Sequence, residues 1–481
     1  MNGLDWKVGL PFLFFLAASS LPAAADNGPV RDIGDRLELF VDDWLIERLA
    51  GAELRLNEPA LREVVFRFDA PGEGSTCLPS VILKDGDRYR MYYRGEPVKG
   101  LENTRYAESA DGITWSRVKA GLYEENGSRE NNIVFREPET QELEVFIDGN
   151  PAAPTGERYK AFCRWKGKDG EGRAVRGIKI LASADGIRWR LLQSDPVISL
   201  LRPKETSILD SDNRAFWDAA RNRYAGYLRV FRDGFRSIKF FASKDFRTWG
   251  EPEWLDFGPA PAEHLYTNVI GPYFRAPHIL LGFPKRFLPD RKFLEEYRWK
   301  GICDTCFISS RDGRKWDRRF MEAFLRPGVD SRNWVYHSPT LAAGGPVETA
   351  PGELSFYILE HYGLPDVRLR RATIRTDGFV SVRAGFAGGE LLTRPLTFSG
   401  RELVLNYATS AAGRVRVEIQ DPEGKPRPGF TLEDCPEIYG DQLERPVAWK
   451  GGSDLSALAG RPVRLRFQLK DADLYSIRFR R

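Results

Sequence analysis

Short runs of β-branched and aromatic residues, bounded by Gly, Asp, Asn and Pro, recur along most of the chain and have the pattern of β-strands. Another apolar stretch precedes each of the main runs, as in LPSVIL (78–83) and LEVFID (143–148). The pattern predicts five antiparallel meanders of similar order. Their main runs are DRYRMYYRG (87–95), ERYKAFCRW (157–165), NRYAGYLRV (222–230), PHILLGFPKRF (277–287) and ELSFYILEHYG (353–363).

A seven-residue motif, S-x-D-G-x-x-W, follows the first four runs, and an eroded copy follows the fifth. Its aspartates stand at positions 111, 185, 245, 312 and 377, so the steps are 74, 60, 67 and 65 residues, and such a repeat indicates an array of similar units. The Asp-Gly pair favours a tight turn, and the tryptophan offers a large apolar surface for packing. We interpret the motif as a turn that packs sheets together, without a catalytic role. The copies are SADGITW, SADGIRW, SKDFRTW, SRDGRKW and RTDGFVS.

Five four-stranded units that cannot each bury both faces become stable by packing around an axis. We therefore predict an all-β protein with a five-bladed β-propeller over residues 26–387, in which an N-terminal segment packs on the propeller or lends it a strand. Two packed sheets with coincidental turns are the alternative. From Gly388 the motif disappears and alternating strands follow, so we predict a β-sandwich over residues 388–481.

The first residues have the composition of a secretory signal peptide, which we assign to residues 1–25. The apolar stretch 8–21 is shorter than the roughly 20 residues of a spanning helix, and Ala23-Ala24-Ala25 gives a small-residue cleavage region. A retained membrane anchor is the alternative. We expect a periplasmic or extracellular protein without a membrane span after cleavage.

The charge balance and the aromatic content limit the classes of molecule that the protein is expected to bind. The chain has 72 Lys and Arg against 68 Asp and Glu, without a basic run, so nucleic acid is excluded as a partner because phosphate binding needs a concentrated positive field. The 12 Trp, 17 Tyr and 30 Phe suit strands and surfaces that stack on sugars. The oligomeric state is not indicated.

The five cysteines do not form a recognisable framework. Cys303 and Cys306 stand in a single CxxC without a second pair or nearby histidines, so we expect buried thiols or one local disulfide rather than a zinc site. We predict no cofactor, and a calcium ion on the propeller axis stays open.

The repeat order resembles that of the five-bladed β-propeller glycoside hydrolases, the invertase-like and arabinanase-like enzymes, many of which carry a C-terminal β-sandwich. LFVDDWLIE (39–47) and NYATSAAGRVRVEIQD (406–421) resemble an exported, mostly uncharacterised bacterial subgroup with this layout.

The resemblance implies three carboxylates at the starts of the innermost strands. Asp148 matches the second blade and Asp210 the third, where the relatives have a glutamate. Leu78 stands where the first-blade aspartate belongs, and Glu73 is a weak substitute.

The geometry of a meander gives a second set of candidates. The start of the first strand and the end of the second share one mouth of the propeller, and all five second strands end in a charged group. We predict a polar pocket whose catalytic carboxylates are Asp148 and Asp210 with Glu263, Glu73 or Glu360, and in which the arginines and His361 bind sugar hydroxyls or an acidic group. The predicted binding residues are Glu73, Arg94, Glu96, Arg164, Arg229, Tyr266, Asn268, Arg286, Glu360 and His361, with Lys285 beside Arg286.

These residues favour a glycoside hydrolase that acts on a polysaccharide or oligosaccharide through a pair of carboxyl groups. The missing first-blade aspartate favours a non-catalytic carbohydrate-binding propeller as the alternative. The clustered arginines would also suit the phosphate of a glycoside phosphorylase.

Overall fold

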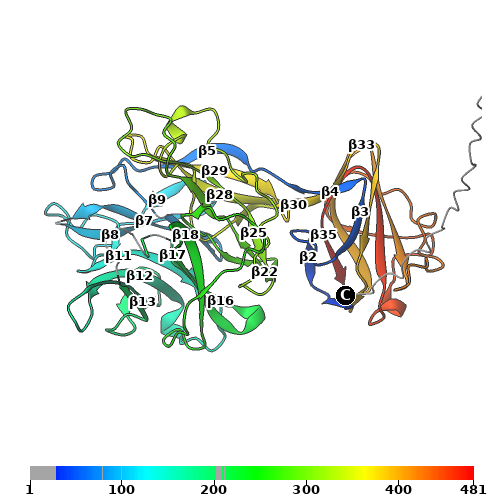
Figure 1. The fold of residues 1–481 in the computed structure, drawn as a ribbon, viewed down its shortest axis with the longest axis horizontal. Coiled ribbons are helices and arrows are strands. Elements are labelled where there is room, and N and C mark those ends of the chain that lie inside the picture. Colours follow the sequence, from blue (N-terminus) through cyan, green and yellow to red (C-terminus); the bar gives the residue numbers. More distant parts are fainter. Residues whose placement is uncertain (1–28, 79, 99, 202–208, 211) are drawn as a thin grey trace, which may run out of the picture.

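The strands form two connected bodies, seen side by side in Figure 1. The structure is a computed structural model, and it describes residues 29–78, 80–98, 100–201, 209–210 and 212–481. The predicted signal peptide lies outside these residues. Among the described residues, no helix is long and apolar enough to cross a membrane. The helices are single 3-10 turns: η1 (Thr155–Glu157), η2 (Ala219–Arg221), η3 (Ser331–Asn333) and η4 (Ser456–Leu458).

The first three units of the larger body are antiparallel meanders that follow the predicted order. The first comprises β6 (Ser80–Asp85), β7 (Arg88–Val98), β8 (Leu101–Ser109), β9 (Trp115–Arg117) and β10 (Ile133–Phe135). The second comprises β11 (Thr140–Ile147), β12 (Tyr159–Lys168), β13 (Ala174–Ser183), β14 (Arg190–Leu191) and β15 (Ile198–Leu201). The third comprises β16 (Arg214–Asp218), β17 (Arg223–Arg232), β18 (Phe235–Ser243) and β19 (Glu253–Trp254).

The fourth unit is interrupted into two three-stranded sheets. The second strand breaks at Phe283-Pro284, where Pro284 has no N–H to donate to a ladder. One sheet contains β21 (Gly271–Tyr273), β22 (Ala276–Gly282) and β25 (Ile308–Ser310), and the other β20 (His264–Leu265), β23 (Lys285–Leu288) and β24 (Ile302–Thr305).

The fifth unit is closed by a strand from the N-terminal part of the chain. Strand β5 (Ala60–Arg67) pairs with β29 as the outer strand. The ring then closes onto the first unit through contacts between β27 and β6 and a bridge from Val81 to Ala343. Neighbouring units also contact one another from first to fifth, so the body is a five-bladed β-propeller, as predicted. The other strands of this unit are β26 (Thr340–Leu341), β27 (Val347–Ala350), β28 (Glu353–Glu360) and β29 (Arg368–Arg375).

The four copies of the motif that contain tryptophan pack a blade on its neighbour, as predicted. In the first copy the Asp111 carboxylate accepts hydrogen bonds from the backbone N–H groups of Ile113 (2.8 Å) and Thr114 (2.7 Å), and these donors outweigh burial and lower the Asp111 pKa to about 2. Each tryptophan packs edge-on against an aromatic ring of the preceding blade. The pairs are Trp115 on Tyr357, Trp189 on Tyr92, Trp249 on Phe162 and Trp316 on Tyr227.

The smaller body contains the C-terminal strands, but its membership departs from the expected boundaries. Strands β2 (Leu37–Leu39), β3 (Ile46–Ala50), β4 (Ala52–Leu56) and β30 (Val380–Ala384) join β31 (Gly389–Thr393), β33 (Glu402–Gln420), β34 (Asp441–Pro446) and β35 (Arg464–Arg480) in one eight-stranded sheet. A two-stranded sheet pairs β1 (Arg31–Gly34) with β32 (Leu396–Phe398). We expected the N-terminal segment to pack on the propeller or to lend it a strand. Leu39 and Val41 pack in one buried cluster with Leu281 of the fourth blade, and β5 pairs with β29 of the fifth blade, whereas β2, β3 and β4 pair within the smaller body. The β-sandwich for residues 388–481 stays a prediction.

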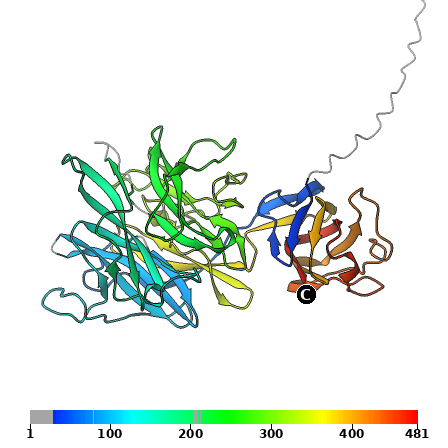
Figure 2. The same ribbon diagram turned by 90° about the horizontal axis from the view of Figure 1, so that it is seen from below.

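Two paired strands connect the bodies. Strands β4 and β30 are antiparallel, and they lie between the propeller and the smaller body in both views (Figures 1 and 2). The eroded fifth motif lies here. Its Asp377 accepts hydrogen bonds from Tyr273 of the fourth blade (2.6 Å) and from Asn406 and Ser476 of the smaller body (3.1 and 2.8 Å). This copy therefore joins the smaller body to the propeller as well as contacting the fourth blade.

The cysteines are buried thiols, one of the two arrangements expected from the sequence. All five are free and buried. Burial raises the pKa of the Cys303 thiol to about 12 and that of Cys306 to about 11, so both are protonated at neutral pH.

Candidate functional site

A polar pocket of about 300 Å³ opens where the innermost strands begin. Leu78 precedes β6, Asp210 precedes β16, Tyr266 precedes β21 and His337 precedes β26, so four blades contribute from the same end of their first strands. The second strand of the first blade adds Arg94. The lining residues within the described part of the chain are Leu78, Arg94, Asp210, Tyr266, Trp299, Lys300, Tyr336, His337 and Tyr362.

Asp210 is the carboxylate among the described lining residues, and two arginines hold it ionised. Arg164 Nη1 lies 3.5 Å from its Oδ1, and Arg229 Nη2 lies 3.3 Å from its Oδ2. Burial alone would raise the Asp210 pKa, but Arg164 and Arg229 outweigh it and the pKa lies below its ordinary 3.8. Its side chain is 30% exposed. Asp210 is therefore an anion that a pocket ligand can reach.

Arg229 is unusual because its guanidinium is completely buried and forms no hydrogen bond. Its three side-chain nitrogens lack a hydrogen-bond partner among the described residues, and its contacts are the ion pair with Asp210 and the rings of Tyr266 and Phe231, 5.2 and 5.4 Å away. Burial lowers the Arg229 pKa to about 10, so the group still carries its charge at neutral pH.

Aromatic side chains form much of the remaining wall. The Trp299 ring lies 6.0 Å from Tyr336 and 5.5 Å from Tyr362 at shallow angles of 38° and 32°. The Tyr266 hydroxyl donates to Asp210 at 3.2 Å and lies 3.2 Å from the Tyr336 hydroxyl. Such rings offer an apolar face with hydroxyls at its edge, which is a surface suited to a sugar ring.

A buried lysine contacts the histidine of the pocket. Lys285 Nζ is hydrogen-bonded to His337 Nδ1 and lies 4.2 Å from the centre of the Tyr266 ring. Burial lowers the Lys285 pKa to about 7 and holds the His337 pKa well below 6.5. Near neutral pH Lys285 is therefore only partly protonated while His337 is neutral, and perturbed groups of this kind are frequent in active sites.

Asp148 is not part of this pocket. It follows the last residue of β11, whereas the pocket lies at the beginning of the first strands. Its carboxylate is completely buried and accepts hydrogen bonds from Lys160 Nζ (2.6 Å) and the Tyr224 hydroxyl (2.7 Å). The structure does not bring Asp148 and Asp210 together, because the eight residues of β11 separate the two ends by about 25 Å. The predicted catalytic pair is therefore not assembled.

The predicted third carboxylates also lie elsewhere. Glu263 forms ion pairs with Arg318 and Arg286 and lines a separate groove. Glu73 is completely buried and accepts hydrogen bonds from Tyr93 and Arg117 at 2.5 and 2.7 Å. Glu360 is buried between Arg368 and Arg370, at 2.7 and 2.8 Å. Each of these carboxylates already has cationic or hydroxyl partners away from the pocket.

The remaining predicted residues divide in the same way. Arg94 and Tyr266 line the pocket, and Arg164 and Arg229 contact Asp210. The other four lie outside the lining: Glu96 is exposed, Asn268 donates to the Asp212 backbone oxygen (2.6 Å), Arg286 pairs with Asp304 (2.6 Å), and His361 lies between Asp330 and Asp366 (2.9 and 2.8 Å).

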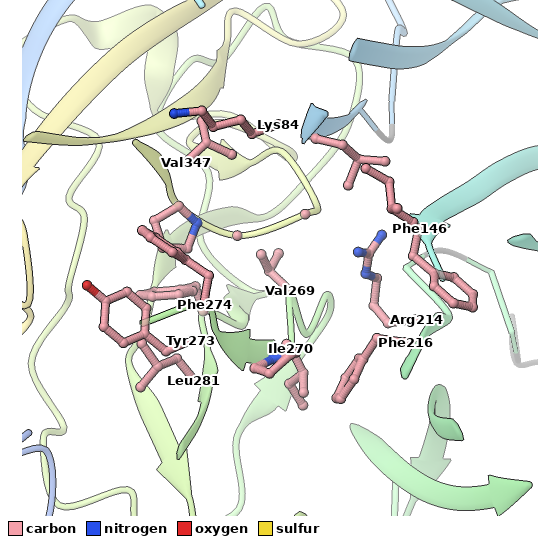
Figure 3. A pocket seen from close by; sticks show the side chains of 18 of the residues that line it. Lys84, Phe146, Arg214, Phe216, Val269, Ile270, Tyr273, Phe274, Leu281 and Val347 are labelled. Carbon is pink, nitrogen blue, oxygen red and sulfur yellow. The ribbon is translucent and has the colours of Figure 1, made fainter. Parts of the chain in front are cut away.

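A larger cavity of about 550 Å³ opens where the innermost strands end. Leu83 and Lys84 of β6 and Phe146 and Ile147 of β11 contribute to it. Figure 3 shows its mainly apolar side chains, among them Phe216, Ile270, Tyr273 and Phe274. Arg214 is its buried cation, and Nη1 of this residue is 3.3 Å from Glu144 Oε2. The cavity offers apolar surface without a reactive pair of the kind found around Asp210.

Sequence reasoning missed the groups that complete the polar pocket. Trp299, Lys300, Tyr336, His337 and Tyr362 were not candidates, and Lys285 was noted only as a charged strand end. Lys285 and His337 are 52 positions apart, so no short sequence motif contains both residues and indicates their contact.

Comparison with known proteins gives likenesses of fold. No family model matches the chain. One curated match is the DNA polymerase II large subunit of Nanoarchaeum equitans, 28% identical over 207 residues, and it covers 38% of this chain but 15% of that protein. The chain thus spans a small part of this relative.

Solved structures with a similar chain path are mostly named as carbohydrate-active proteins. A β-fructofuranosidase of glycoside hydrolase family 32 from Bombyx mori has 10% identity and a TM-score of 0.43, covering 87% of this chain and 94% of that one. A fructofuranosidase from Schwanniomyces occidentalis, complexed with fructosylnystose, has 10% identity and a TM-score of 0.41, covering 86% and 96%. An N-acetylgalactosamine deacetylase from F. plautii has 14% identity and a TM-score of 0.42, covering 68% and 97%.

Proposed function

We propose that this protein is a carbohydrate-active enzyme that hydrolyses a glycosidic bond in the polar pocket around Asp210. The observation that carries the proposal is an ionised carboxylate, open to a pocket, beside a wall of Trp299, Tyr336 and Tyr362. Glycoside hydrolysis needs one group that activates water and one that protonates the leaving oxygen.

Asp210 suits the first role and not the second. Because Arg164 and Arg229 keep its pKa below 3.8, it is deprotonated at neutral pH and is able to accept a proton from water. An acid in the same pocket must therefore be another group.

Lys285 and His337 supply a proton donor in this proposal. Water attacks the anomeric carbon and gives its proton to Asp210, while the glycosidic C–O bond breaks. The leaving oxygen takes a proton from His337, and Lys285 replaces that proton. The Lys285 pKa of about 7 suits a donor that works at neutral pH.

The direct test is a screen of the purified full chain on plant and algal polysaccharides and oligosaccharides, with new reducing ends as the readout. Asp210→Asn should lower kcat by at least about 100-fold. Asp233→Asn is the matched control, because Asp233 is 91% exposed on a turn of the same blade. Unchanged turnover by Asp210→Asn on a cleaved glycan would refute the proposal.

A non-catalytic glycan-binding propeller is the second candidate. It is favoured because Asp210 is the only carboxylate in the pocket lining formed by the described residues. Saturable binding of a glycan without product formation would support it over hydrolysis.

A further inference from the structure

Two aromatic side chains outside the polar pocket have no role in the site described above. Phe293 is 54% exposed, and its ring stacks on that of Trp334 with the ring centres 5.4 Å apart and an angle of 30° between the planes. Neither ring belongs to a buried hydrophobic cluster of the described residues. Packing of the core therefore does not explain why this pair lies at the surface.

The two loops that carry the pair emerge on the face of the propeller where the pocket opens. Phe293 lies between β23 and β24, in the loop that also supplies Trp299 and Lys300 to the pocket. Trp334 precedes β26, two residues before Tyr336 of the pocket. In an antiparallel blade the end of the second strand and the beginning of the first strand share one face. The exposed pair and the pocket therefore lie on the same face.

Two aromatic contacts join these loops, one in the pocket wall and one outside it. The Trp299 ring lies 6.0 Å from that of Tyr336, and the Phe293 ring lies 5.4 Å from that of Trp334. Because Trp334 and Tyr336 are two residues apart, their Cα atoms are separated by no more than about 7 Å. The exposed pair therefore begins about one sugar unit beyond the pocket wall.

Hydrogen bonds hold both loops near the pair. The Trp334 indole N–H donates to the Gly328 backbone oxygen at 2.9 Å, and the Gly301 N–H donates to the Arg291 oxygen at 2.9 Å, which joins the two ends of the loop around Phe293. Since one face of the Phe293 ring contacts Trp334, its exposed surface is that of the opposite face and the edge. An exposed ring face in a fixed position is able to stack on the apolar face of a sugar.

We propose that Phe293 and Trp334 form a second sugar-binding subsite, which binds a unit of the substrate chain that extends out of the polar pocket. This inference rests on the proposed function, because it takes the ligand of the pocket to be a sugar. The pocket volume of about 300 Å³ is at the small end of typical ligand sites, so the pocket holds one ring and the next units lie outside it. The subsite favours a glycan chain over a glycoside with a small leaving group.

A docking surface for another protein is the other use of an exposed aromatic pair. The position of Phe293 and Trp334 beside the pocket favours the sugar, because a protein bound there would cover the opening through which the substrate enters. A sugar chain, in contrast, continues from the pocket onto the pair without a second partner.

The test is calorimetric titration with galacto-, manno-, xylo- and arabino-oligosaccharides of one to six units. The full chain with Asp210→Asn serves as the parent, so that cleavage does not disturb the titration. In the series that binds, the affinity of the parent should rise by at least about threefold from the shortest member that binds to the longer members. Adding Phe293→Ala should remove this increase and leave the affinity for the shortest member unchanged, because the truncated ring is exposed and outside the pocket.

Matched variants separate stacking from an effect on the fold. Phe293→Tyr keeps a ring and should keep the increase with length, whereas Trp334→Ala should remove it and gives the same test if Phe293→Ala fails to fold. Phe386→Ala removes a ring that is 65% exposed between β30 and β31 and should leave the increase unchanged. Equal affinity of the parent for all lengths would overturn the inference. A loss of affinity for the shortest member as large as that for the longest, in both variants of the pair, would also overturn it.

Failure of this inference is separable from failure of the proposed function. Cleavage by the wild type that depends on Asp210, with kcat/KM independent of chain length, would keep the enzyme and refute the subsite. Length-dependent binding that Phe293→Ala abolishes, without cleavage by the wild type, would keep the subsite and refute the hydrolase. No binding of any of the four series would refute both.

Discussion

The two ends of the propeller differ in what their side chains offer to a ligand. The cavity at the ends of the innermost strands is the larger, at about 550 against 300 Å³, and its wall is mainly apolar (Figure 3). The smaller pocket combines Asp210, arginines, aromatic rings and a histidine with a lysine behind it. Chemistry, rather than volume, therefore identifies the candidate site.

The same contrast separates two buried carboxylates. Asp148 has a lysine and a tyrosine as close partners and no exposed surface, which is the environment of a structural ion pair. Asp210 has arginines at longer distances, and almost a third of its side chain is exposed. A carboxylate whose partners leave it accessible is able to act on a substrate, whereas a sealed one holds two strands together.

The largest expected effect is on turnover. The ratio of kcat between wild type and variant should be at least about 100 for Asp210→Asn and close to 1 for Asp148→Asn, measured on the same glycan below the melting temperature of both variants. A reversed order would move the site to the other end of the blades.

The pH dependence sharpens the assignment of the proton donor. If Lys285 supplies the proton, kcat falls as the pH rises through about 7, and Asp210 stays ionised as the pH falls, down to its lowered pKa. A pH profile of kcat between pH 5 and 9 checks this. Activity that increases steadily up to pH 9 would exclude the Lys285–His337 pair as the acid.

Asp148→Asn should be strongly destabilising although it leaves catalysis intact. The change removes the closer of the two carboxylates beside buried Lys160 and leaves Glu157 at 3.7 Å. The expected loss in the free energy of unfolding is about 3 kcal/mol, the lower end of the range for a broken buried pair. Urea unfolding at pH 7 measures this loss. A change below about 1 kcal/mol would show that the Asp148–Lys160 pair is not a main support of the blade.

Lys285→Met should show the opposite combination, with lost activity and gained stability. The folded-state pKa of about 7 lies below the ordinary 10.5, so the unfolded chain binds a proton between these values that the folded chain does not. The wild type should therefore lose stability as the pH falls from 10 to 7, and the variant should lack this component. We expect the variant to be more stable at pH 7 by on the order of 1–3 kcal/mol. Equal urea curves for both proteins at pH 7 and pH 10 would contradict the lowered pKa.

The smallest effect is expected in the apolar cavity. Phe274 is 50% exposed there, so Phe274→Ala should change the free energy of unfolding by less than about 1 kcal/mol and leave kcat unchanged. A loss of turnover comparable with that of Asp210→Asn would assign function to the larger cavity and reverse the comparison.

Much of the fold was predictable because one motif recurs. The S-x-D-G-x-x-W turns mark the blades in the sequence. Their tryptophans pack against the preceding blade, as expected. The boundary between the bodies was not predictable, because β30 pairs with β35 across 88 to 92 residues and resembles another blade strand in the sequence.

The candidate site was predictable only in part. Asp210 and the arginines followed from the ends of the strands, but Asp148 was wrongly placed because the polar start of β11, Thr140-Gln141, hides where the strand begins. His337 and Lys285 meet through the packing of two blades, and such a contact has no local signal.

The most direct test of the account is a crystal structure of Asp210→Asn soaked with a glycan that the wild type cleaves. The account predicts one sugar ring in the pocket lined by Trp299 and Tyr362, with its glycosidic oxygen toward His337. A sugar bound only in the apolar cavity, or in the groove lined by Glu263, would contradict it.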